Sequence, residues 1–391
     1  MIDRGPHTTS PCGTATPPVP QKKRRLLRWA GFALFGVSML CTSPSVHAAP
    51  IGDVSDVQDE PVQPKVKVAV DKALNWMGQN QQPDGTWAHG SSAGTTAVPS
   101  LAVLAFLARG HVPGQGPYGE VLNKAIDFVL DSQTTEGPKK GLIAREDGNA
   151  VMYEHGISAV MLSEVFGMVD DARRARIDRA LALAVQVIVD AQKPDGNRKN
   201  DNDRGGWRYT PKAGDSDISC TGWQLMALRG AANCGAVVPR SVLEEGLGYV
   251  KRCAVASGGF GYQAHAGAPN QARTGTGILS TILIGGDKNA PEVQKAGEYL
   301  MANPPDRGVE FYFYAIYYDS QALNQLGGKY WQMVYPKLVD HLLSLQMDNG
   351  TFRFEGGGGQ ENDAGDAYRT SMSVLALCVP FRYLPLYQAD K

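Results

Sequence analysis

Residues 81–87 read Gln-Gln-Pro-Asp-Gly-Thr-Trp, and this stretch decides the fold because the chain repeats it. A second copy, Gln-Lys-Pro-Asp-Gly, occupies residues 192–196, with its aromatic residue delayed to Trp207. A third copy, Gln-Met-Asp-Asn-Gly-Thr-Phe, occupies residues 346–352. Degenerate copies lie at residues 133–137 and 257–262.

The spacing of these copies indicates a repeat architecture. Gln82 and Gln346 are 264 residues apart, which five steps divide into repeats of about 53 residues. A period of tens of residues indicates one supersecondary unit copied along the chain. Each copy then buries its apolar face against its neighbours.

Every copy shows the same order of predicted elements. An amphipathic helix ends at the Gln, and the Asp-Gly or Asn-Gly pair turns the chain through positive φ. A polar loop then leads into a second helix that is apolar on nearly every side, which is typical of a buried helix, and that ends near a Gly as its C-cap. The amphipathic helices are predicted around 73–77, 125–130, 184–189 and 338–343, and the apolar helices around 100–110, 223–230, 278–285 and 373–378.

Two concentric rings of helices, outer amphipathic and inner apolar, satisfy both patterns. The sequence contains six such pairs, which is enough to close a ring. We therefore predict an all-α fold, an α/α toroid of about six inner and six outer helices, over residues 67–391.

The N-terminus carries the pattern of a secretory signal. Basic residues 22–25 precede the apolar run 29–41, and Val-His-Ala at 46–48 precedes an Ala-Pro pair. A membrane anchor is the alternative, but a span needs about 20 apolar residues and this run is shorter. The sequence predicts a signal peptide at 1–48, a linker at 49–66, and export to the periplasm or cell envelope after cleavage near Ala48. No integral membrane span is expected in the mature chain.

The net charge bears on nucleic-acid binding, and the cysteine content bears on disulfide formation. The net charge of -1 gives no electrostatic attraction for nucleic acid. Four cysteines remain after cleavage, and an even number in an exported chain permits disulfides. Cys234 and Cys253 are a candidate pair. Cys220 and Cys378, on apolar helices, are predicted to be small core residues.

The repeated motif resembles the signature of the prenyltransferase and squalene-cyclase repeat family, over about residues 65–385. The resemblance implies an α/α toroid around a central cavity. It also implies two kinds of enzyme: cyclases, in which an Asp-x-Asp-Asp motif protonates an isoprenoid, and protein prenyltransferase β subunits, in which Asp, Cys and His hold zinc.

Neither set of family residues is complete in this sequence. Residues 215–218, Asp-Ser-Asp-Ile, have two acids of the cyclase motif and lack the third. Residues 366–370, Asp-Ala-Tyr-Arg-Thr, resemble the zinc segment Asp-x-Tyr-His-Thr, with Arg369 at the position of the His ligand. Residues 217–220 resemble its Asp-x-Cys segment with one residue too many. Arg does not bind zinc, so no metal or other cofactor is expected.

The N-terminal ends of the inner helices of such a toroid open onto one mouth of the cavity, where converging polar groups make a candidate site. An alternative for these groups is helix capping, which is favoured for Thr95, Thr96 and Ser219 and stays open for His155, Asp217, Asp366 and Arg369. The candidate catalytic residues are Asp217, Asp366, His155 and Asp215, and the candidate ligand-binding residues are Tyr153, Trp223, Arg273, Tyr314, Tyr368 and Arg369.

The expected function is the binding of an isoprenoid-like, hydrophobic small molecule in the central cavity, with its transformation left open. One alternative is a non-catalytic interaction toroid of the cell envelope. Another is an enzyme similar to polysaccharide lyases and glycoside hydrolases, which use Arg, Tyr, His and carboxylates in an open groove. The sequence identifies no protein partner.

Overall fold

A computed structural model describes residues 64–87, 94–145, 148, 150–193, 196, 199–306, 308–354, 359–381 and 383–387. The predicted signal peptide and most of the predicted linker lie outside these residues. Helix α1 begins at Pro64, ahead of the predicted domain boundary at residue 67. Its first residue suits the position, because the fixed φ of proline favours the first turn of a helix.

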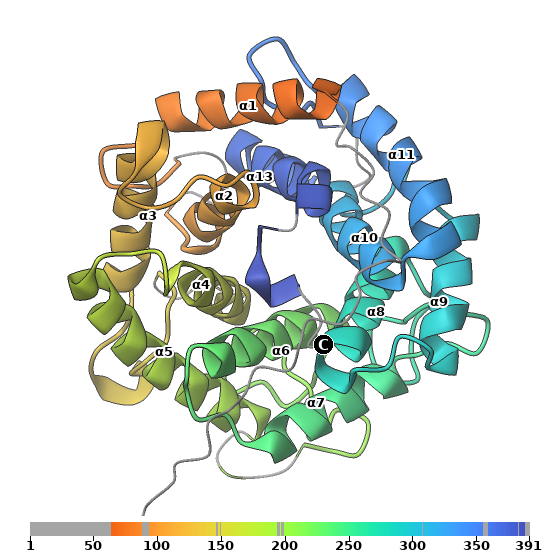
Figure 1. The fold of residues 1–391 in the computed structure, drawn as a ribbon. Coiled ribbons are helices and arrows are strands. Elements are labelled where there is room, and N and C mark those ends of the chain that lie inside the picture. The colour runs from red at the N-terminus through yellow and green to blue at the C-terminus, as the bar shows by residue number, and fades with distance from the viewer. Residues whose placement is uncertain are drawn as a thin grey trace, which may run out of the picture. The chain divides into compact units, whose positions relative to one another are not determined.

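The helices form two concentric rings, as Figure 1 shows. The predicted α/α toroid with six inner and six outer helices is therefore confirmed. A short helix, α12 (Gln360–Asp363), precedes the last inner helix. The outer ring consists of α1 (Pro64–Gln79), α3 (Gly119–Asp131), α5 (Asp171–Gln192), α7 (Arg240–Arg252), α9 (Pro291–Ala302) and α11 (Gly328–Leu345). The inner ring consists of α2 (Ala97–Ala108), α4 (Val151–Val165), α6 (Ile218–Asn233), α8 (Gln271–Gly285), α10 (Tyr312–Leu326) and α13 (Asp366–Leu377).

Burial separates the two rings in the way that the sequence pattern predicts. Inner helix α2 buries every residue from Val98 to Ala108. Outer helix α1 buries only one stripe, which includes Val70, Leu74 and Met77. A helix that is apolar all round is stable only when it is surrounded, whereas an amphipathic helix leaves its polar face in water. Inner helices therefore pack on both sides, and outer helices cover them.

Four glutamines of the repeated motif each join one outer helix to the next: α1 to α3, α3 to α5, α5 to α7, and α11 to α1. Each side-chain amide donates two hydrogen bonds, one to a glycine carbonyl of its own loop and one to a carbonyl of the next outer helix. These pairs of acceptors are Gly85 and Val121 for Gln81, Gly141 and Ala180 for Gln133, Gly205 and Val242 for Gln192, and Gly350 and Ala69 for Gln346. Because Ala69 belongs to α1, the last copy of the motif closes the ring.

The same bonds correct the alignment of two copies. In the copy that begins at Gln192, the glycine that accepts from this side chain is Gly205, rather than Gly196 of the Asp-Gly pair. In the degenerate copy that begins at Gln133 it is Gly141, rather than Gly137. Extra residues are therefore inserted between the Gln and its turn glycine, which explains why Trp207 comes late. Trp207 still donates from Nε1 to the carbonyl of Ile188, as Trp87 does to Met77.

We expect Gln346→Ala to lower the free energy of unfolding by about 1–3 kcal/mol, because removing the amide leaves partly buried carbonyls without their donor. Urea unfolding monitored by circular dichroism measures the change. Gln186→Ala is the matched control, since its amide bonds only the neighbouring Asp190 on the surface of α5. Equal losses in the two variants would contradict a role for Gln346 in closing the ring.

The four cysteines in the described residues are free thiols. The candidate pair Cys234 and Cys253 is not joined, because the two residues follow the C-terminal ends of successive, antiparallel helices, α6 and α7. Thirteen residues of α7 rise by about 20 Å, and a disulfide requires Cα atoms within about 7 Å. Cys220 and Cys378 are buried, as predicted for core residues.

The last described segment of the chain lies inside the ring. Residues 379–381 and 383–387, with the short helices Val379–Phe381 and Pro385–Tyr387, follow α13 and reach the centre of the toroid in Figure 1. Leu386 and Tyr387 are buried there. Within the described ranges, no helix combines the length and the apolar character that crossing a membrane requires.

Candidate functional site

The candidate site lies where the N-terminal ends of four inner helices come together. The loop before α6 bonds the start of α4, since the carbonyl of Tyr209 accepts from the amide of Met152. The loop before α8 bonds the start of α6, since the carbonyl of Tyr262 accepts from the amide of Ile218. Successive loops are thus tied together around one mouth, and the predicted site residues of α4, α6, α8 and α10 lie in or beside the first turns of their helices.

Asp217 is the buried acid of this mouth. It is the N-cap of α6, and its Oδ1 accepts from the amide of Cys220 at 2.9 Å. Its Oδ2 lies 3.3 Å from Nε of Arg208 without a well-aligned hydrogen bond. Burial raises the pKa of Asp217 to about 6, and the Cys220 amide and Arg208 oppose that rise only in part. Asp217 therefore caps α6 and also has a raised pKa.

The loop inserted between Gln192 and Gly205 holds the backbone segment that carries Asp217. The buried ammonium of Lys199 donates to the carbonyl of Asp215 at 2.9 Å and to Oγ of Ser216 at 3.2 Å. Asp203 accepts from the amide of Ser216 at 2.8 Å. Burial lowers the pKa of Lys199 to about 8. The insertion thus fixes the backbone on which the candidate acids Asp215 and Asp217 stand.

Arg208 links the acids to an aromatic cluster that the sequence did not reveal. Its guanidinium pairs with Asp215 and lies 4.6 Å from the ring centre of Tyr209 and 5.3 Å from that of Tyr262. The guanidinium of Arg273 lies 5.1 Å from the same Tyr262 ring. The hydroxyls of Tyr209 and Tyr262 are hydrogen-bonded to each other.

A signal for these tyrosines exists in the sequence. Tyr209 stands two residues after the motif aromatic Trp207, and Tyr262 stands two residues after Phe260. The two tyrosines are 53 residues apart, which matches the repeat period. The position two residues beyond the buried aromatic therefore faces the mouth in both repeats, although no local periodicity marks it.

Three further tyrosines lie in the first turns of inner helices at this mouth. Tyr153, Tyr314 and Tyr368, from α4, α10 and α13, each keep part of their surface accessible. Burial nevertheless raises the pKa of all three hydroxyls above the usual range, and Asp217 adds to the rise at Tyr153 and Tyr314. Tyr153 lies 5.8 Å from Tyr209, ring centre to ring centre.

Glu361 fixes the positions of two of these tyrosines, Tyr314 and Tyr368. Its carboxylate accepts from the backbone amides of Phe313 and Tyr314 at 3.1 and 2.9 Å, at the start of α10. It also accepts from the hydroxyl of Tyr368 at 3.2 Å. A carboxylate at a helix N-terminus satisfies amides that have no partner within the helix. One buried acid therefore sets the relative position of α10 and α13 at the mouth.

Farther along the inner helices lies a fully buried aromatic cluster of Trp223, Tyr317 and Tyr318. Trp223 stacks on Tyr317 at 6.1 Å and meets Tyr318 edge-on at 5.6 Å, while Tyr314 lies 4.7 Å from Tyr318. Burial raises the pKa of the Tyr314 hydroxyl, and side-chain hydrogen bonding with Tyr318, Thr276 and Trp223 opposes that rise in part.

The remaining predicted residues are engaged in backbone contacts. His155 is fully buried, accepts at Nδ1 from the amide of Ile143 at 3.0 Å and donates from Nε2 to the carbonyl of Ala184 at 3.1 Å. Burial lowers its pKa to about 4, so the ring is neutral at pH 7. Arg369 donates to the carbonyls of Phe352, Glu361 and Asn362 and pairs with Asp366. Catalytic roles for His155 and Asp366 stay predictions, and so does an anion-binding role for Arg369.

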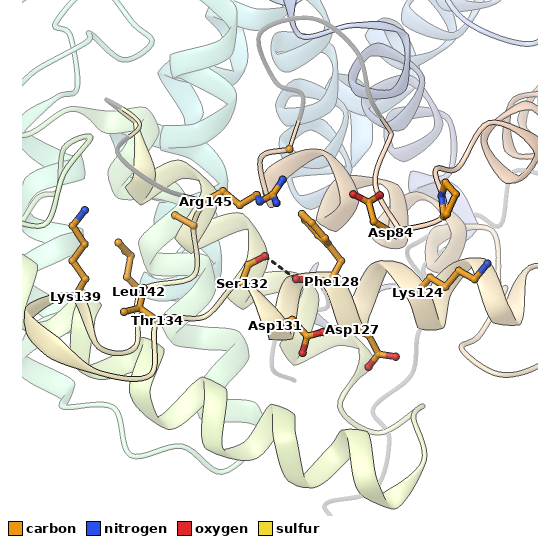
Figure 2. A pocket seen from close by; sticks show the side chains of 13 residues that line it. Asp84, Lys124, Asp127, Phe128, Asp131, Ser132, Thr134, Lys139, Leu142 and Arg145 are labelled. Carbon is orange, nitrogen blue, oxygen red and sulfur yellow. Dashed lines mark hydrogen bonds between the residues drawn. The ribbon is translucent and has the colours of Figure 1, made fainter.

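A hollow lies on the rim, between the first two motif loops and the outer face of α3 (Figure 2). It has a volume of about 1160 Å³, and the guanidinium of Arg145 lies over the ring of Phe128 at 5.3 Å. Two of its acids, Asp127 and Asp131, are paired with arginines of α5. None of the site residues predicted from the sequence lines this groove.

Residues 366–370 resemble the zinc segment of protein prenyltransferase β subunits, which raises the question of a metal site. Among the residues with described positions, no group of three or more His, Cys, Asp or Glu side chains is arranged to hold a metal ion. Arg369 occupies the position of the expected His ligand and donates to three carbonyls.

Comparison with known proteins identifies the fold. No protein-family model matches the sequence, and no curated protein sequence matches it significantly. The structure is similar to that of the GH76A α-1,6-mannanase from Salegentibacter sp. HEL1_6, with a TM-score of 0.59 and 9% identity over 81% of this chain and 99% of that chain.

Two other solved structures have the same architecture. The type II terpene cyclase MstE from Scytonema gives a TM-score of 0.51 at 14% identity, covering 82% of this chain and 99% of that chain. The unsaturated glucuronyl hydrolase from Bacillus sp. GL1 gives 0.54 at 12% identity, covering 80% and 96%. At such low identity, the similarity shows the α/α toroid alone. A fold shared by a cyclase and two carbohydrate enzymes does not select between their chemistries.

Proposed function

We propose that the protein binds an isoprenoid-like, hydrophobic molecule in the central cavity of the toroid and that Asp217 acts on it as an acid. The observation that supports the proposal is the position of Tyr153, Tyr314 and Tyr368 in the first turns of inner helices at one mouth. All three keep accessible surface, and the charge of Asp217, whose own pKa is raised, acts on Tyr153 and Tyr314. Apolar walls with a few convergent polar groups are typical of small-molecule sites.

The pKa of Asp217 limits the chemistry that it can perform. A carboxyl with a pKa of about 6 is suited to general acid catalysis near neutral pH, where donor and acceptor states are both populated. Protonation of an alkene requires a much stronger acid, and Ile218 stands where the cyclase motif has its third carboxylate. Asp217 is therefore proposed to protonate an oxygen atom of the ligand, such as a hydroxyl or ether, rather than a carbon-carbon double bond.

We also propose that the chain belongs to the prenyltransferase and squalene-cyclase repeat family and is exported. The family assignment is supported by the four glutamines that bridge successive repeats in the same way. The export assignment rests on the pattern of residues 1–48, which lie outside the described residues.

A second candidate function is a non-catalytic binding toroid. The helix cap that Asp217 makes and its contact with Arg208 favour this candidate. Each of these structural roles explains an acidic residue at this position without catalysis. Mass spectrometry of an organic extract from the mature protein, purified from its native envelope, tests the hydrophobic site itself. A stoichiometric isoprenoid or other lipid supports the hydrophobic site, whereas a bound glycan or an empty toroid contradicts it.

Asp217→Asn tests the acid role. We expect turnover of the compound found in the extract to fall by about 10²- to 10⁴-fold, the usual contribution of one general acid. The fold should be retained, because Asn is as good an N-cap as Asp. Asp178→Asn, on the exposed face of α5, is the control for the loss of one carboxylate. Unchanged turnover in Asp217→Asn would remove Asp217 from the mechanism and leave the binding toroid.

A further inference from the structure

The groove on the rim, shown in Figure 2, is built from segments that the fold holds in place. The motif glutamines of its two loops, Gln81 and Gln133, bond carbonyls of α3 and α5. In the second loop, Thr134 and Leu142 both line the groove, and the amide of Thr134 donates to the carbonyl of Leu142 at 2.9 Å. The groove is therefore preformed, and binding to a preformed site costs less conformational entropy.

The guanidinium of Arg145 is positioned over this groove. The backbone amide of Arg145 donates to Oε2 of the buried Glu154 at 3.3 Å, and the same oxygen accepts from the amide of Thr96 at 2.9 Å. The guanidinium lies 5.3 Å from the ring centre of Phe128. A Cβ at Gly94 would lie 2.7 Å from a terminal nitrogen of Arg145, so the absence of a side chain at Gly94 leaves room for the guanidinium.

The three acids that line the groove are each engaged with other groups of the protein. Asp127 and Asp131 point toward α5, as Figure 2 shows, and are paired there with arginines. Oδ1 of Asp84 accepts from the amide and the hydroxyl of Thr86 at 3.0 and 2.7 Å. The hydrogen bond from the Thr86 hydroxyl lowers the pKa of Asp84, and the charge of Arg145 adds to this effect.

The cations of the groove are less fully engaged. Arg145 and Lys124 are exposed, and neither forms an ion pair with any residue that the structure describes. Lys139 lines the groove as well. One acid outside an ion pair, Asp84, thus stands against two such cations, so the groove offers an excess of positive charge. A guanidinium is suited to carboxylates, because it can donate two parallel hydrogen bonds to one of them.

We propose that this groove binds an acidic peptide segment of a partner protein, with a carboxylate of the peptide paired to Arg145. The site lies apart from the central cavity, so the proposal is independent of the proposed function. A peptide is favoured over an acidic saccharide because the Phe128 ring lies between Arg145 and the core, where it is not available for stacking on a sugar ring. Leu142 and Ala144 also line the groove and suit aliphatic side chains of a peptide.

The test uses a fluorescently labelled peptide of alternating glutamate and alanine as the probe, with dissociation constants measured by anisotropy. The wild-type protein should bind it, and a matched peptide with glutamine in place of glutamate should bind at least about tenfold more weakly. Arg145→Gln should weaken binding of the glutamate peptide about tenfold, because one charge-assisted pair is lost. Arg240→Gln is the matched control, since it removes the same charge from a side chain on α7 that is 91% exposed.

Equal losses of affinity in Arg145→Gln and Arg240→Gln would indicate a diffuse electrostatic attraction and overturn the proposal. Equal binding of the glutamate and glutamine peptides by the wild-type protein, or binding of neither, would also overturn it. An oligosaccharide of uronic acid units serves as competitor. If this competitor bound more tightly than the peptide and lost affinity in Arg145→Gln, the groove would be a saccharide site and the peptide proposal would be wrong.

Circular dichroism of each variant establishes that it is folded. Arg145 is exposed, and the bond from its backbone amide to Glu154 does not depend on its side chain. If Arg145→Gln nevertheless failed to fold, Arg145→Lys would carry the same test, because lysine keeps the charge and loses the planar donor pair. Wild-type affinity in a folded Arg145→Lys variant would then contradict the pairing of Arg145 with a carboxylate through two hydrogen bonds.

Discussion

Gly205→Ala should lower the free energy of unfolding by about 2–5 kcal/mol, one of the largest effects expected from a single methyl group in this protein. Gly205 has φ of +86°, where a side chain costs about 1–2 kcal/mol. A Cβ at this position would also overlap with the carbonyl oxygen of Glu245 on α7. Forcing two packed backbones apart costs about 1–3 kcal/mol more, and the bond from Gln192 to the Gly205 carbonyl would be disturbed.

Gly196→Ala is the matched control, and urea unfolding of both variants measures the difference. Gly196 also has a positive φ, +74°, but no atom of the described residues lies within 4 Å of a Cβ placed there. Its variant should therefore lose only the conformational cost of about 1–2 kcal/mol. If the two variants lost equal stability, the close approach of the Gly205 loop to α7 would not be a determinant of the fold.

The same comparison shows how far the sequence predicts the fold. The glutamine and the aromatic residue of each motif are local signals, and they located the helix pairs and the ring. The turn glycine is defined by its approach to the next outer helix, which is a contact between repeats. Sequence reading therefore assigned the turn to Gly196, the Asp-Gly glycine, whereas Gly205 accepts the bond from Gln192. The same reason explains why Cys234 and Cys253 are close in the chain and far apart in space.

The residues of the candidate site also fall into two groups: those that a local sequence signal predicts and those that are set by contacts between repeats. Asp217, Tyr153 and Tyr314 could be predicted because they lie at the starts of apolar helices, which the sequence pattern marks. Arg208 and Tyr262 could not, since their pairing joins loops of different repeats. Tyr387 could not be placed either, because its partner Tyr317 is 70 residues away in the sequence. Residues that close a ring or fill its centre are set by the assembled toroid.

Asp319→Asn should stabilise the protein at neutral pH and remove part of its pH dependence. Asp319 lies in α10, is fully buried, and neither carboxylate oxygen has a hydrogen-bond partner in the described chain. It packs against Gly275 of α8, where a Cβ would lie 2.5 Å from Oδ1. Burial raises the pKa of Asp319 well above the usual range, because an isolated charge is costly in an apolar environment.

The sign of the effect follows from proton linkage. A carboxyl whose pKa is raised in the folded state stabilises the fold fully below its unfolded pKa, and this stabilisation is lost as pH rises toward the folded value. Each unit of difference between the two pKa values contributes about 1.4 kcal/mol. Asn does not titrate, so the gain of Asp319→Asn over wild type should grow as pH rises from the unfolded pKa of the carboxyl toward neutrality.

Urea unfolding of both proteins at a series of pH values measures this gain, and the difference between them cancels the contributions of Asp217 and Glu164, whose pKa values are raised as well. Asp178→Asn, at an exposed position of α5, should show no such trend. A variant Asp319→Asn that is less stable than wild type at neutral pH would mean that the carboxylate has a favourable partner. Without one, Asp319 lowers the stability of the α8–α10 contact, and the close approach at Gly275 leaves its side chain no route to water.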